Sequence, residues 1–344
     1  MQLITEYASP AELSGYARES IKDREENAFT LSRWLPSDTI EDLEYRFETG
    51  GGGLTEAANY RAYDASSDIG VREGGARASG ELPPISRKMP VSEYEQIRMR
   101  ASAMMSADIA EKVYGDTEIL VNAIAARVEL ARGEAIFNSA VTLNENGVQA
   151  SVNFGRLAEH TTATEINWTD TETSTVFDDL EAWRDLMVDN TGKAPRWALM
   201  PSRIARVMRS NAQLCRMSTT DYNAPSVLSL DELNALLLKH ELPQVTTYDA
   251  RVVFQGTAQR ITPADKIALL PETGDALGKT LWGVPTEAND SRYGLAPGEQ
   301  GGAYVGNYKT EDPQTVWTRA TAIVLPVAAN PNLSLTAQVT GITV

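Results

Sequence analysis

Cysteine and histidine are scarce in this sequence. Cys215 is the single cysteine among 344 residues, and His160 and His240 are the two histidines. One cysteine cannot form an intrachain disulfide, and two distant histidines offer little for a metal site or a proton relay. We therefore predict no catalytic residue, no metal and no cofactor. Cys215 is expected to be a packing residue, and a thiol nucleophile is the alternative.

Long apolar runs and positive charge are also in short supply. No run approaches the roughly eighteen apolar residues that cross a membrane, and the start MQLITEYASPAEL has no basic segment followed by an apolar one. We predict neither a membrane span nor export. The chain has 31 Lys and Arg against 47 Asp and Glu, a formal net charge of −16 at pH 7. Such a field repels phosphate, so a protein that grips nucleic acid through its overall charge is disfavoured, whereas one that coexists with packed DNA would also be acidic.

A match to a phosphate-binding loop is missing too. The nearest sequence runs from Gly274 to Thr280 and has three residues between its glycines, where the motif has four. We interpret it as a turn.

A long helix is the clearest element that is present. Leu120, Ile124, Val128, Ala131 and Ala135 form one apolar stripe, which predicts a helix over 117–138 that begins at a cap on Asp116 or Thr117. At about 1.5 Å per residue this spine helix would be about 33 Å long. Gly133 is its weak point.

The residues before this helix show few apolar patterns, so they are expected to contribute little to a hydrophobic core. Ser9 to Glu12 forms a capping box for a helix that ends near Asn27, whose thin apolar stripe suggests a surface helix or one that docks on a partner. An alternating strand follows, with Leu43, Tyr45 and Phe47 on one face. From Gly50 to Lys88 no substantial apolar pattern is found, so we expect a long loop that lies on a partner subunit.

The residues after the spine helix predict compact α+β structure. A polar strand pair is expected around 142–154. Thr175 to Asp178 reads as an acidic capping box for a helix that ends at Gly192, and a helix begins at Pro201 and Ser202. Strands are predicted at Trp197 to Met200, 244–248, 251–254 and 266–270, and the tail reads as two strands broken at Asn330-Pro331.

Several segments occur together in a specific order. They are Leu35-Pro36; Tyr60 to Asp64; the run 70–88 with Leu82-Pro83-Pro84-Ile85-Ser86; the spine helix; Asn153-Phe154-Gly155-Arg156 with Trp168; Leu199-Met200-Pro201; 242–271; and 313–332 with Trp317 and Leu325-Pro326-Val327. In this order they resemble the major capsid (head) proteins of tailed bacteriophages related to the lambda head protein, which have the Hong Kong 97 (HK97) type of fold.

The resemblance implies an α+β, HK97-like capsid fold with four parts. These are an N-terminal arm over 1–47, an extended E-loop over 48–89 that overlaps a neighbouring subunit, a peripheral domain over 90–173 with the spine helix at 117–138, and an axial domain over 174–300. Residues 301–344 return to the peripheral domain. Among the E-loop charges, we expect Arg72, Arg77, Glu81, Arg87 and Lys88 to make contacts between subunits.

The implied function is that of the major capsid protein of a tailed double-stranded DNA bacteriophage, a structural protein and not an enzyme. It would self-assemble as hexamers and pentamers into an icosahedral head around the genome, in the virion, after assembly in the host bacterial cytoplasm. The implied partners are further copies, a portal protein and DNA bound without sequence specificity, with a decoration protein as a further candidate. Because the chain starts almost at the arm, we expect any scaffolding protein to be separate.

Two other functions remain open at this point. An encapsulin-like nanocompartment shell shares the fold but encloses an enzyme. A hydrolase that uses Cys215 or a carboxylate pair is a candidate from another class. Some relatives of the phage group cross-link lysine to asparagine, but Lys88 has no matching partner context, so that cross-link is not predicted.

Overall fold

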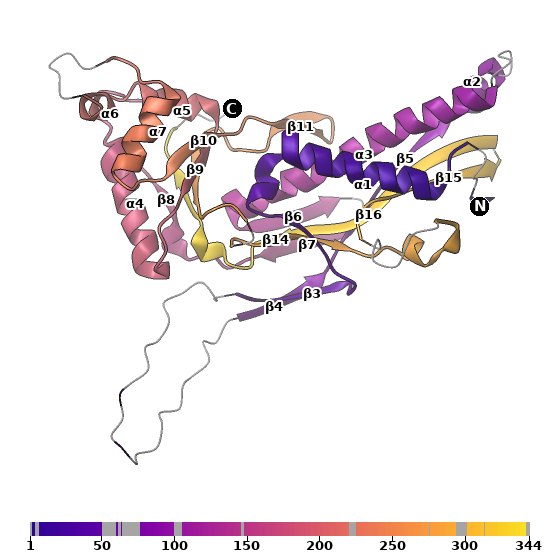
Figure 1. Cartoon of the computed structure of the whole chain (residues 1–344), viewed down its shortest axis with the longest axis horizontal. Coiled ribbons are helices and arrows are strands. Elements are labelled where there is room, and N and C mark those ends of the chain that lie inside the picture. The colour runs from indigo at the N-terminus through magenta and orange to yellow at the C-terminus, as the bar shows by residue number, and fades with distance from the viewer. Residues whose placement is uncertain are drawn as a thin grey trace.

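A computed structural model gives the fold of the chain. It describes residues 2–3, 7–49, 60, 63, 76–99, 105–145, 148–219, 225–274, 276–293, 301–312 and 314–341. The described part is elongated, with a long half built on one sheet and a short half built on another (Figure 1). We call the long half peripheral and the short half axial, after the parts that the resemblance implies.

The peripheral sheet has six strands in the order β1-β15-β16-β14-β2, with β5 also paired to β16. Its strands are β1 (Gln2–Leu3), β2 (Ser37–Thr39), β5 (Pro84–Val91), β14 (Lys279–Gly283), β15 (Tyr304–Glu311) and β16 (Gln314–Val327). β16 is antiparallel to β15, β5 and β14. This one strand therefore organises the sheet.

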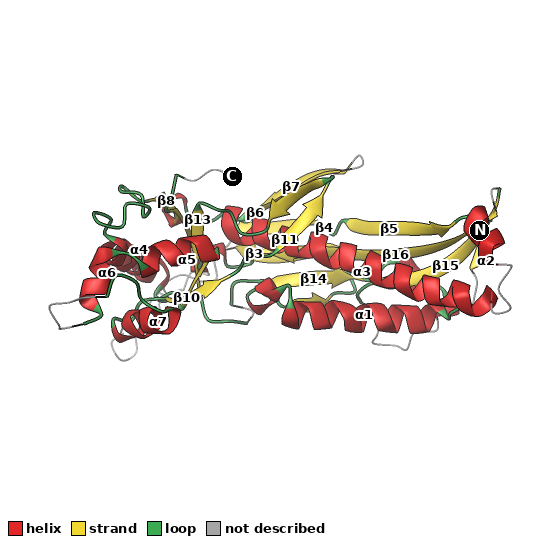
Figure 2. Ribbon diagram, turned by 90° about the horizontal axis from the view of Figure 1, so that it is seen from above, coloured by secondary structure: helices red, strands yellow, loops and turns green. Residues whose placement is uncertain are grey.

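Two helices, α1 (Pro10–Asn27) and α3 (Met105–Asn138), cover one face of this sheet (Figure 2). The core between them contains Leu13 and Ala17 of α1, Ile124 of α3 and Ala320 of β16. α1 begins with the predicted capping box, in which the Glu12 amide donates to Ser9 Oγ at 3.2 Å. Its thin apolar stripe packs on the chain's own sheet and its other residues are largely exposed, as expected for a surface helix.

The spine helix is longer than predicted. α3 includes the predicted range but begins at Met105 instead of Thr117. Thr117 is no cap, because its hydroxyl donates to the Val113 carbonyl at 2.7 Å, one turn earlier in the same helix. A short helix, α2 (Glu93–Met99), precedes it.

The axial sheet has five strands in the order β10-β9-β13-β17-β8. They are β8 (Thr161–Ala163), β9 (Trp197–Met200), β10 (Gln244–Thr247), β13 (Lys266–Leu270) and β17 (Leu335–Gln338). Four helices pack in this half, namely α4 (Val176–Thr191), α5 (Ser202–Arg209), α6 (Ala212–Met217) and α7 (Leu230–Lys239). The strands predicted near 197, 244 and 266 and the break at Asn330-Pro331 are confirmed.

The two ends of α4 differ in how well the sequence predicted them. Gly192 ends the helix in the left-handed conformation at φ 71°, as expected. The capping box at Thr175 is wrong, because the Thr175 side chain makes no capping hydrogen bond. The free amide of Phe177 donates instead to Gln213 Oε1 at 3.1 Å, so a residue of α6 caps this helix.

Three two-stranded ribbons complete the fold. They are β3 (Glu44–Thr49) with β4 (Ala76–Glu81), β6 (Ala140–Glu145) with β7 (Val148–Asn153), and β11 (Arg251–Phe254) with β12 (Thr257–Arg260). The β6–β7 pair confirms the strand pair expected around 142–154. Short 3₁₀ turns lie at Thr30–Arg33, Ala158–His160, Thr286–Asn289, Ser291–Tyr293 and Pro331–Leu333.

Two expected boundaries differ from the strand pairing. β14 lies within the segment assigned to the axial domain, yet it pairs with β16 in the peripheral sheet. β17 lies within the segment assigned to the peripheral domain, yet it completes the axial sheet beside β13 and β8. Each half is therefore built from segments that are distant in sequence.

The predicted coreless loop is also shorter than expected. β5 covers the end of the E-loop segment and pairs with β16 over Pro84 to Val91. Most of the remaining E-loop segment lies outside the described residues, except β4, the end of β3 and a few single positions. Among the helices that the structure describes, none combines the length and apolar character of a membrane span.

Candidate functional site

The β3–β4 ribbon leaves the body of the molecule between the two halves (Figure 1). Tyr45 of β3 is only 4% exposed and Leu82, just after β4, only 2%, so the base of the ribbon is anchored in the core. The Tyr45 ring lies across Gly80, where a Cβ atom would come within 2.4 Å of the hydroxyl oxygen. The same burial raises the pKa of Tyr45. A projecting ribbon is thus fixed at its base by one buried aromatic ring.

The predicted contact residues fall into two groups. Arg77 and Glu81 lie on β4 of the ribbon, and Glu81 is exposed opposite Glu44. Arg87 and Lys88 are exposed, but they lie on β5 of the peripheral sheet and not on a coreless loop, which corrects that expectation. Arg72 lies outside the described residues.

Lys88 packs against its own sheet. Its ammonium nitrogen lies 4.4 Å from the centre of the Trp317 ring, which also stacks on Tyr308 with centroids 6.3 Å apart. Its register partner on β16 is Arg319, whose guanidinium pairs with the Glu287 carboxylate. A cation held over an aromatic face is stabilised by about 0.5–1 kcal/mol at an exposed site. Lys88 therefore helps to stabilise the fold of its own chain, although its side chain is exposed.

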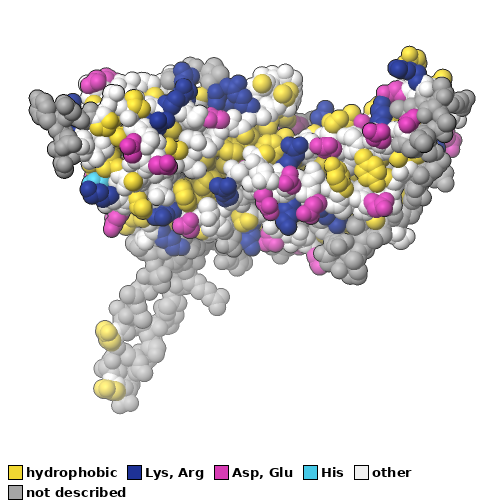
Figure 3. Space-filling model, turned by 45° about the horizontal axis from the view of Figure 1, so that its top comes forward, with side chains coloured by type: hydrophobic (Ala, Val, Ile, Leu, Met, Phe, Trp, Pro, Cys, Tyr) yellow, Lys and Arg dark blue, Asp and Glu magenta, His cyan; other side chains and the backbone are white. Residues whose placement is uncertain are grey.

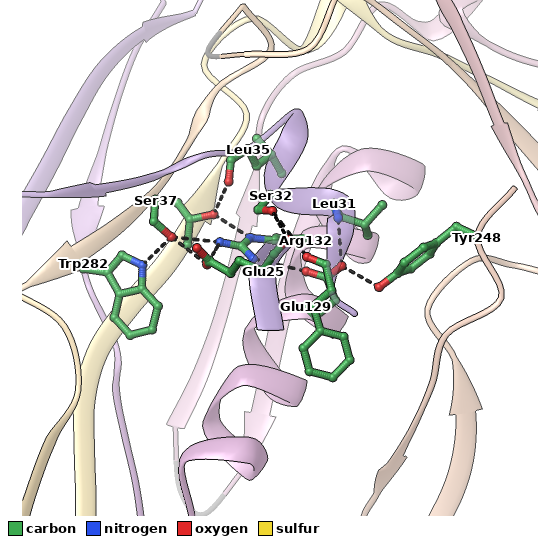
Figure 4. A network of polar contacts seen from close by, with 11 residues as sticks. Glu25, Leu31, Ser32, Leu35, Ser37, Glu129, Arg132, Tyr248 and Trp282 are labelled. Carbon is green, nitrogen blue, oxygen red and sulfur yellow. Dashed lines mark hydrogen bonds and ion pairs between the residues drawn. The ribbon is translucent and has the colours of Figure 1, made fainter. Parts of the chain in front are cut away.

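A buried polar network joins the parts of the molecule at the spine helix (Figure 4). Glu129 and Arg132 of α3 are 0% and 1% exposed and pair at 3.2 Å. Arg132 also donates to Thr280 Oγ1 at 2.9 Å and to Ser37 Oγ at 3.0 Å, and it pairs with Glu25 of α1. Glu129 accepts hydrogen bonds from the Leu31 amide at 3.0 Å and from the Tyr248 hydroxyl at 2.6 Å. One ion pair thus holds the N-terminal segment, β14 and an axial residue to the spine.

The electrostatics of this network follow from its burial. Loss of water raises the pKa of Glu129, while Arg132, Tyr248 and the Leu31 amide favour its charged form. Burial, and then the Glu129 charge, raise the pKa of Tyr248, so its hydroxyl stays a donor. Breaking a buried pair by removing one partner costs about 3–5 kcal/mol. Sequence analysis missed this site, although a Glu and an Arg three residues apart beside an apolar stripe were a usable signal.

The residues considered for catalysis, Cys215 and His240, pack against other side chains of the axial half. Cys215 is 4% exposed in the axial core, and burial raises the pKa of its thiol, which opposes formation of a nucleophilic thiolate. The interpretation of Cys215 as a packing residue is confirmed. The His240 ring packs edge-on against Phe177 at 5.1 Å. Within the described residues, His, Cys, Asp and Glu form no group of three or more that could hold a metal ion.

Comparison with solved structures identifies the fold of the chain. A protein assigned as the capsid protein of a prophage in E. coli CFT073 matches with a TM-score of 0.61 at 14% identity, over 95% of this chain and 99% of that one. A phage-related protein from Bordetella bronchiseptica RB50 matches with a TM-score of 0.55 at 12% identity, over 100% of both chains. The fold is that of the HK97-like capsid proteins.

The sequence itself places the chain within a family of this class. The family described as phage major capsid protein E matches residues 36–339. The chain belongs to this family, and it is a phage major capsid protein, as the sequence resemblance predicted. No curated protein matches the sequence.

Proposed function

We propose that the chain self-assembles as hexamers and pentamers into the icosahedral head of a tailed double-stranded DNA phage. The observation that supports this proposal is the family match over residues 36–339 on an HK97-like fold. Many weak contacts, repeated over many copies, give a closed shell a large total avidity. Under this proposal the chain has a structural role and no catalytic one.

The proposal extends to the division of labour within the subunit. The arm and the ribbon would reach the neighbouring copy, the peripheral half would join capsomers, and the axial half would meet at the five-fold and six-fold axes. The five charged residues Arg72, Arg77, Glu81, Arg87 and Lys88 remain proposed contact residues. The two on β5 are supported by their exposure in the isolated chain.

Further partners follow from the proposed shell. We include a separate scaffolding protein, a portal protein, a decoration protein and the packaged DNA, with assembly in the host bacterial cytoplasm. The acidic net charge of −16 supports contact with DNA without tight binding.

The test is the state of the purified protein, expressed alone and beside a scaffolding protein. Sedimentation and negative-stain microscopy should show capsomer rings, tubes or closed shells. A strictly monomeric species under both conditions would contradict the proposal. Particles isolated from infected cells should contain DNA, whereas an enzyme cargo would favour the encapsulin-like alternative.

A further inference from the structure

One helix of the peripheral half turns its apolar side chains away from the body. α2 is attached to its own chain by a polar contact, the ion pair between Glu95 and Lys112 of α3. Its apolar residues Tyr94 and Ile97 lie three positions apart on one face and are 69% and 64% exposed. A surface helix ordinarily turns its apolar face toward the core of its own chain. The outward apolar face of α2 is therefore available to a partner.

Arg98 gives this outward face a positive charge. Its guanidinium lies 6.0 Å from the centre of the Tyr94 ring, and among the described residues it has no ion-pair partner. The two carboxylates of α2 are engaged within the chain, Glu95 in its ion pair with α3 and Glu93 as acceptor of the Gln314 amide at 3.2 Å. α2 therefore presents aromatic, aliphatic and cationic groups together.

The exposed faces of α1 and α3 share a sequence pattern. On α1 the exposed residues of the pattern are Glu12, Gly15-Tyr16 and Glu19. On α3 they are Glu111, Tyr114-Gly115 and Glu118. Residues three and four apart share one face of a helix, so on each helix a tyrosine and a glycine lie between two glutamates. The two tyrosine rings meet edge to face, with centroids 6.5 Å apart, and join the two faces into one patch.

This α1–α3 patch, which also includes Ile119, has an apolar centre and an acidic frame. Tyr16, Tyr114 and Ile119 are 43%, 40% and 53% exposed. A Cβ atom at Gly15 or Gly115 would meet no atom within 4 Å, so packing within the chain does not require glycine at either position. Figure 3 shows hydrophobic side chains between Asp and Glu side chains over the long half. Such a patch suits an apolar partner that carries a positive charge.

The outward face of α2 has the chemistry that this patch suits. Among the described residues, Glu111 and Glu118 have no ion-pair partner, and both lie on the face of Tyr114. α2 lies at the outer end of the peripheral half beside the start of α3, and α1 runs alongside (Figure 1). Because the helix and the patch belong to the same chain, a second copy can supply the occupant. Two copies related by a two-fold axis at this end would make the contact twice.

We propose that α2 of one copy docks on the α1–α3 patch of a second copy, and the reverse, across a two-fold axis that joins two capsomers. Tyr94 and Ile97 cover the apolar centre, and Arg98 faces Glu118. Burial of apolar surface supplies the affinity, and the opposite charges set the orientation. The inference rests on the proposed self-assembly and specifies one of its contacts.

Substitutions on both sides of the contact test it. Y94S/I97S removes the apolar side chains of α2, R98E and E118R each reverse one charge, and R98E/E118R places opposite charges across the contact again. Because these side chains are exposed, the thermal transition of the monomer should change little. L238S, which replaces a 47% exposed apolar residue on α7 of the axial half, is the matched control.

Sedimentation at a series of protein concentrations measures the concentration at which capsomers join into shells. Y94S/I97S should raise it at least about tenfold, because apolar surface is lost from both halves of the contact. R98E and E118R should each raise it about tenfold, because the two-fold contact contains the reversed charge twice. R98E/E118R should return to within about threefold of the wild type, and L238S should match the wild type. Capsomers should persist in every variant.

The outcomes separate this contact from the proposed function. If the wild type forms shells and every variant forms them at the same concentration, the contact is wrong and the shell function stands. If R98E/E118R recovers nothing that the single variants lose, the assigned charge pair is wrong and the inference is overturned. If the variants form shells normally but no longer sediment with a purified scaffolding protein, the patch serves that protein and the inference is again overturned. If the wild type forms no particle under any condition, the proposed function itself fails.

Discussion

His160 connects three parts of the axial half through its imidazole ring. It is fully buried, and its Nδ1–H donates to the Ser334 carbonyl at 3.2 Å. Its Nε2 accepts from the Asn190 amide of α4 at 3.0 Å, and this hydrogen bond requires the neutral ring, because protonated Nε2 could not accept it. Burial is the main reason that the pKa of His160 lies below its ordinary value of 6.5.

This lowered pKa predicts a loss of stability in mild acid. Because the unfolded chain takes up the proton first, the contribution of His160 is complete above pH 6.5 and falls as the pH drops toward the folded pKa. The slope cannot exceed about 1.4 kcal/mol per pH unit for one group. Thermal unfolding of wild type and H160Q between pH 5 and 8 should show a smaller pH dependence in the variant. Equal profiles for wild type and H160Q would refute the assignment.

At the scale of elements, the spine helix contains two glycines with different surroundings. Gly115 is exposed, and a Cβ atom there would meet no other atom within 4 Å. At Gly133 a Cβ atom would lie 2.7 Å from Ile261 Cγ2 and 2.8 Å from the Ile261 carbonyl oxygen. Gly133 lets the segment after β12 approach the helix backbone, so it is a packing requirement and not only a weak point.

The two glycines therefore predict alanine substitutions of opposite sign. G115A should stabilise the protein by about 1 kcal/mol, because alanine favours the helix over glycine by that amount. G133A gains the same propensity but forces apart two packed backbones, which costs about 1–3 kcal/mol and should leave it less stable than the wild type. Chemical denaturation of both variants measures the difference. A stabilised G133A would show that the Ile261 segment moves away without cost.

Elements were predictable where local chemistry determines them. The capping box at Ser9, the strand at Trp197 and the stop at Gly192 depend on neighbouring residues, and all three were found. β5 was missed because its two prolines and exposed charges resemble a loop. Prolines are tolerated on a strand at the edge of a sheet, and among the strands that the structure describes β5 pairs with β16 alone. That pairing joins residues more than two hundred positions apart, which no local pattern reveals.

At the scale of the whole molecule, the E-loop arginines give a test of assembly that is separate from folding. R72A/R77A should impair the formation of capsomers and shells while leaving the thermal transition of the monomer nearly unchanged. The reason is that the predicted loop has no apolar pattern and is expected to add little to the monomer's core. Calorimetry and sedimentation on the same samples measure both quantities. Parallel loss of folding and assembly would show that the loop belongs to the monomer's own core.

The fold class and the family were readable from the sequence, whereas the distant partners of the Glu129–Arg132 pair were not. The network draws on α1, the segment before β2, β2 itself, α3, β14 and the residue after β10, and only the folded chain brings them together. Sequence patterns describe the neighbours of each residue along the chain, whereas this network is formed by contacts between segments that are distant in sequence.

The order of the strands along the chain determines when each sheet can form during synthesis. The peripheral sheet lacks the strand that joins β15, β5 and β14 until translation passes Val327, and the axial sheet cannot close until Gln338 has been made. Domains generally fold as units during synthesis, but neither half of this chain is complete until its late strands emerge. A nascent chain thus cannot present its finished edges to a neighbour on the same messenger RNA. Subunits would therefore meet as completed molecules drawn from a common pool.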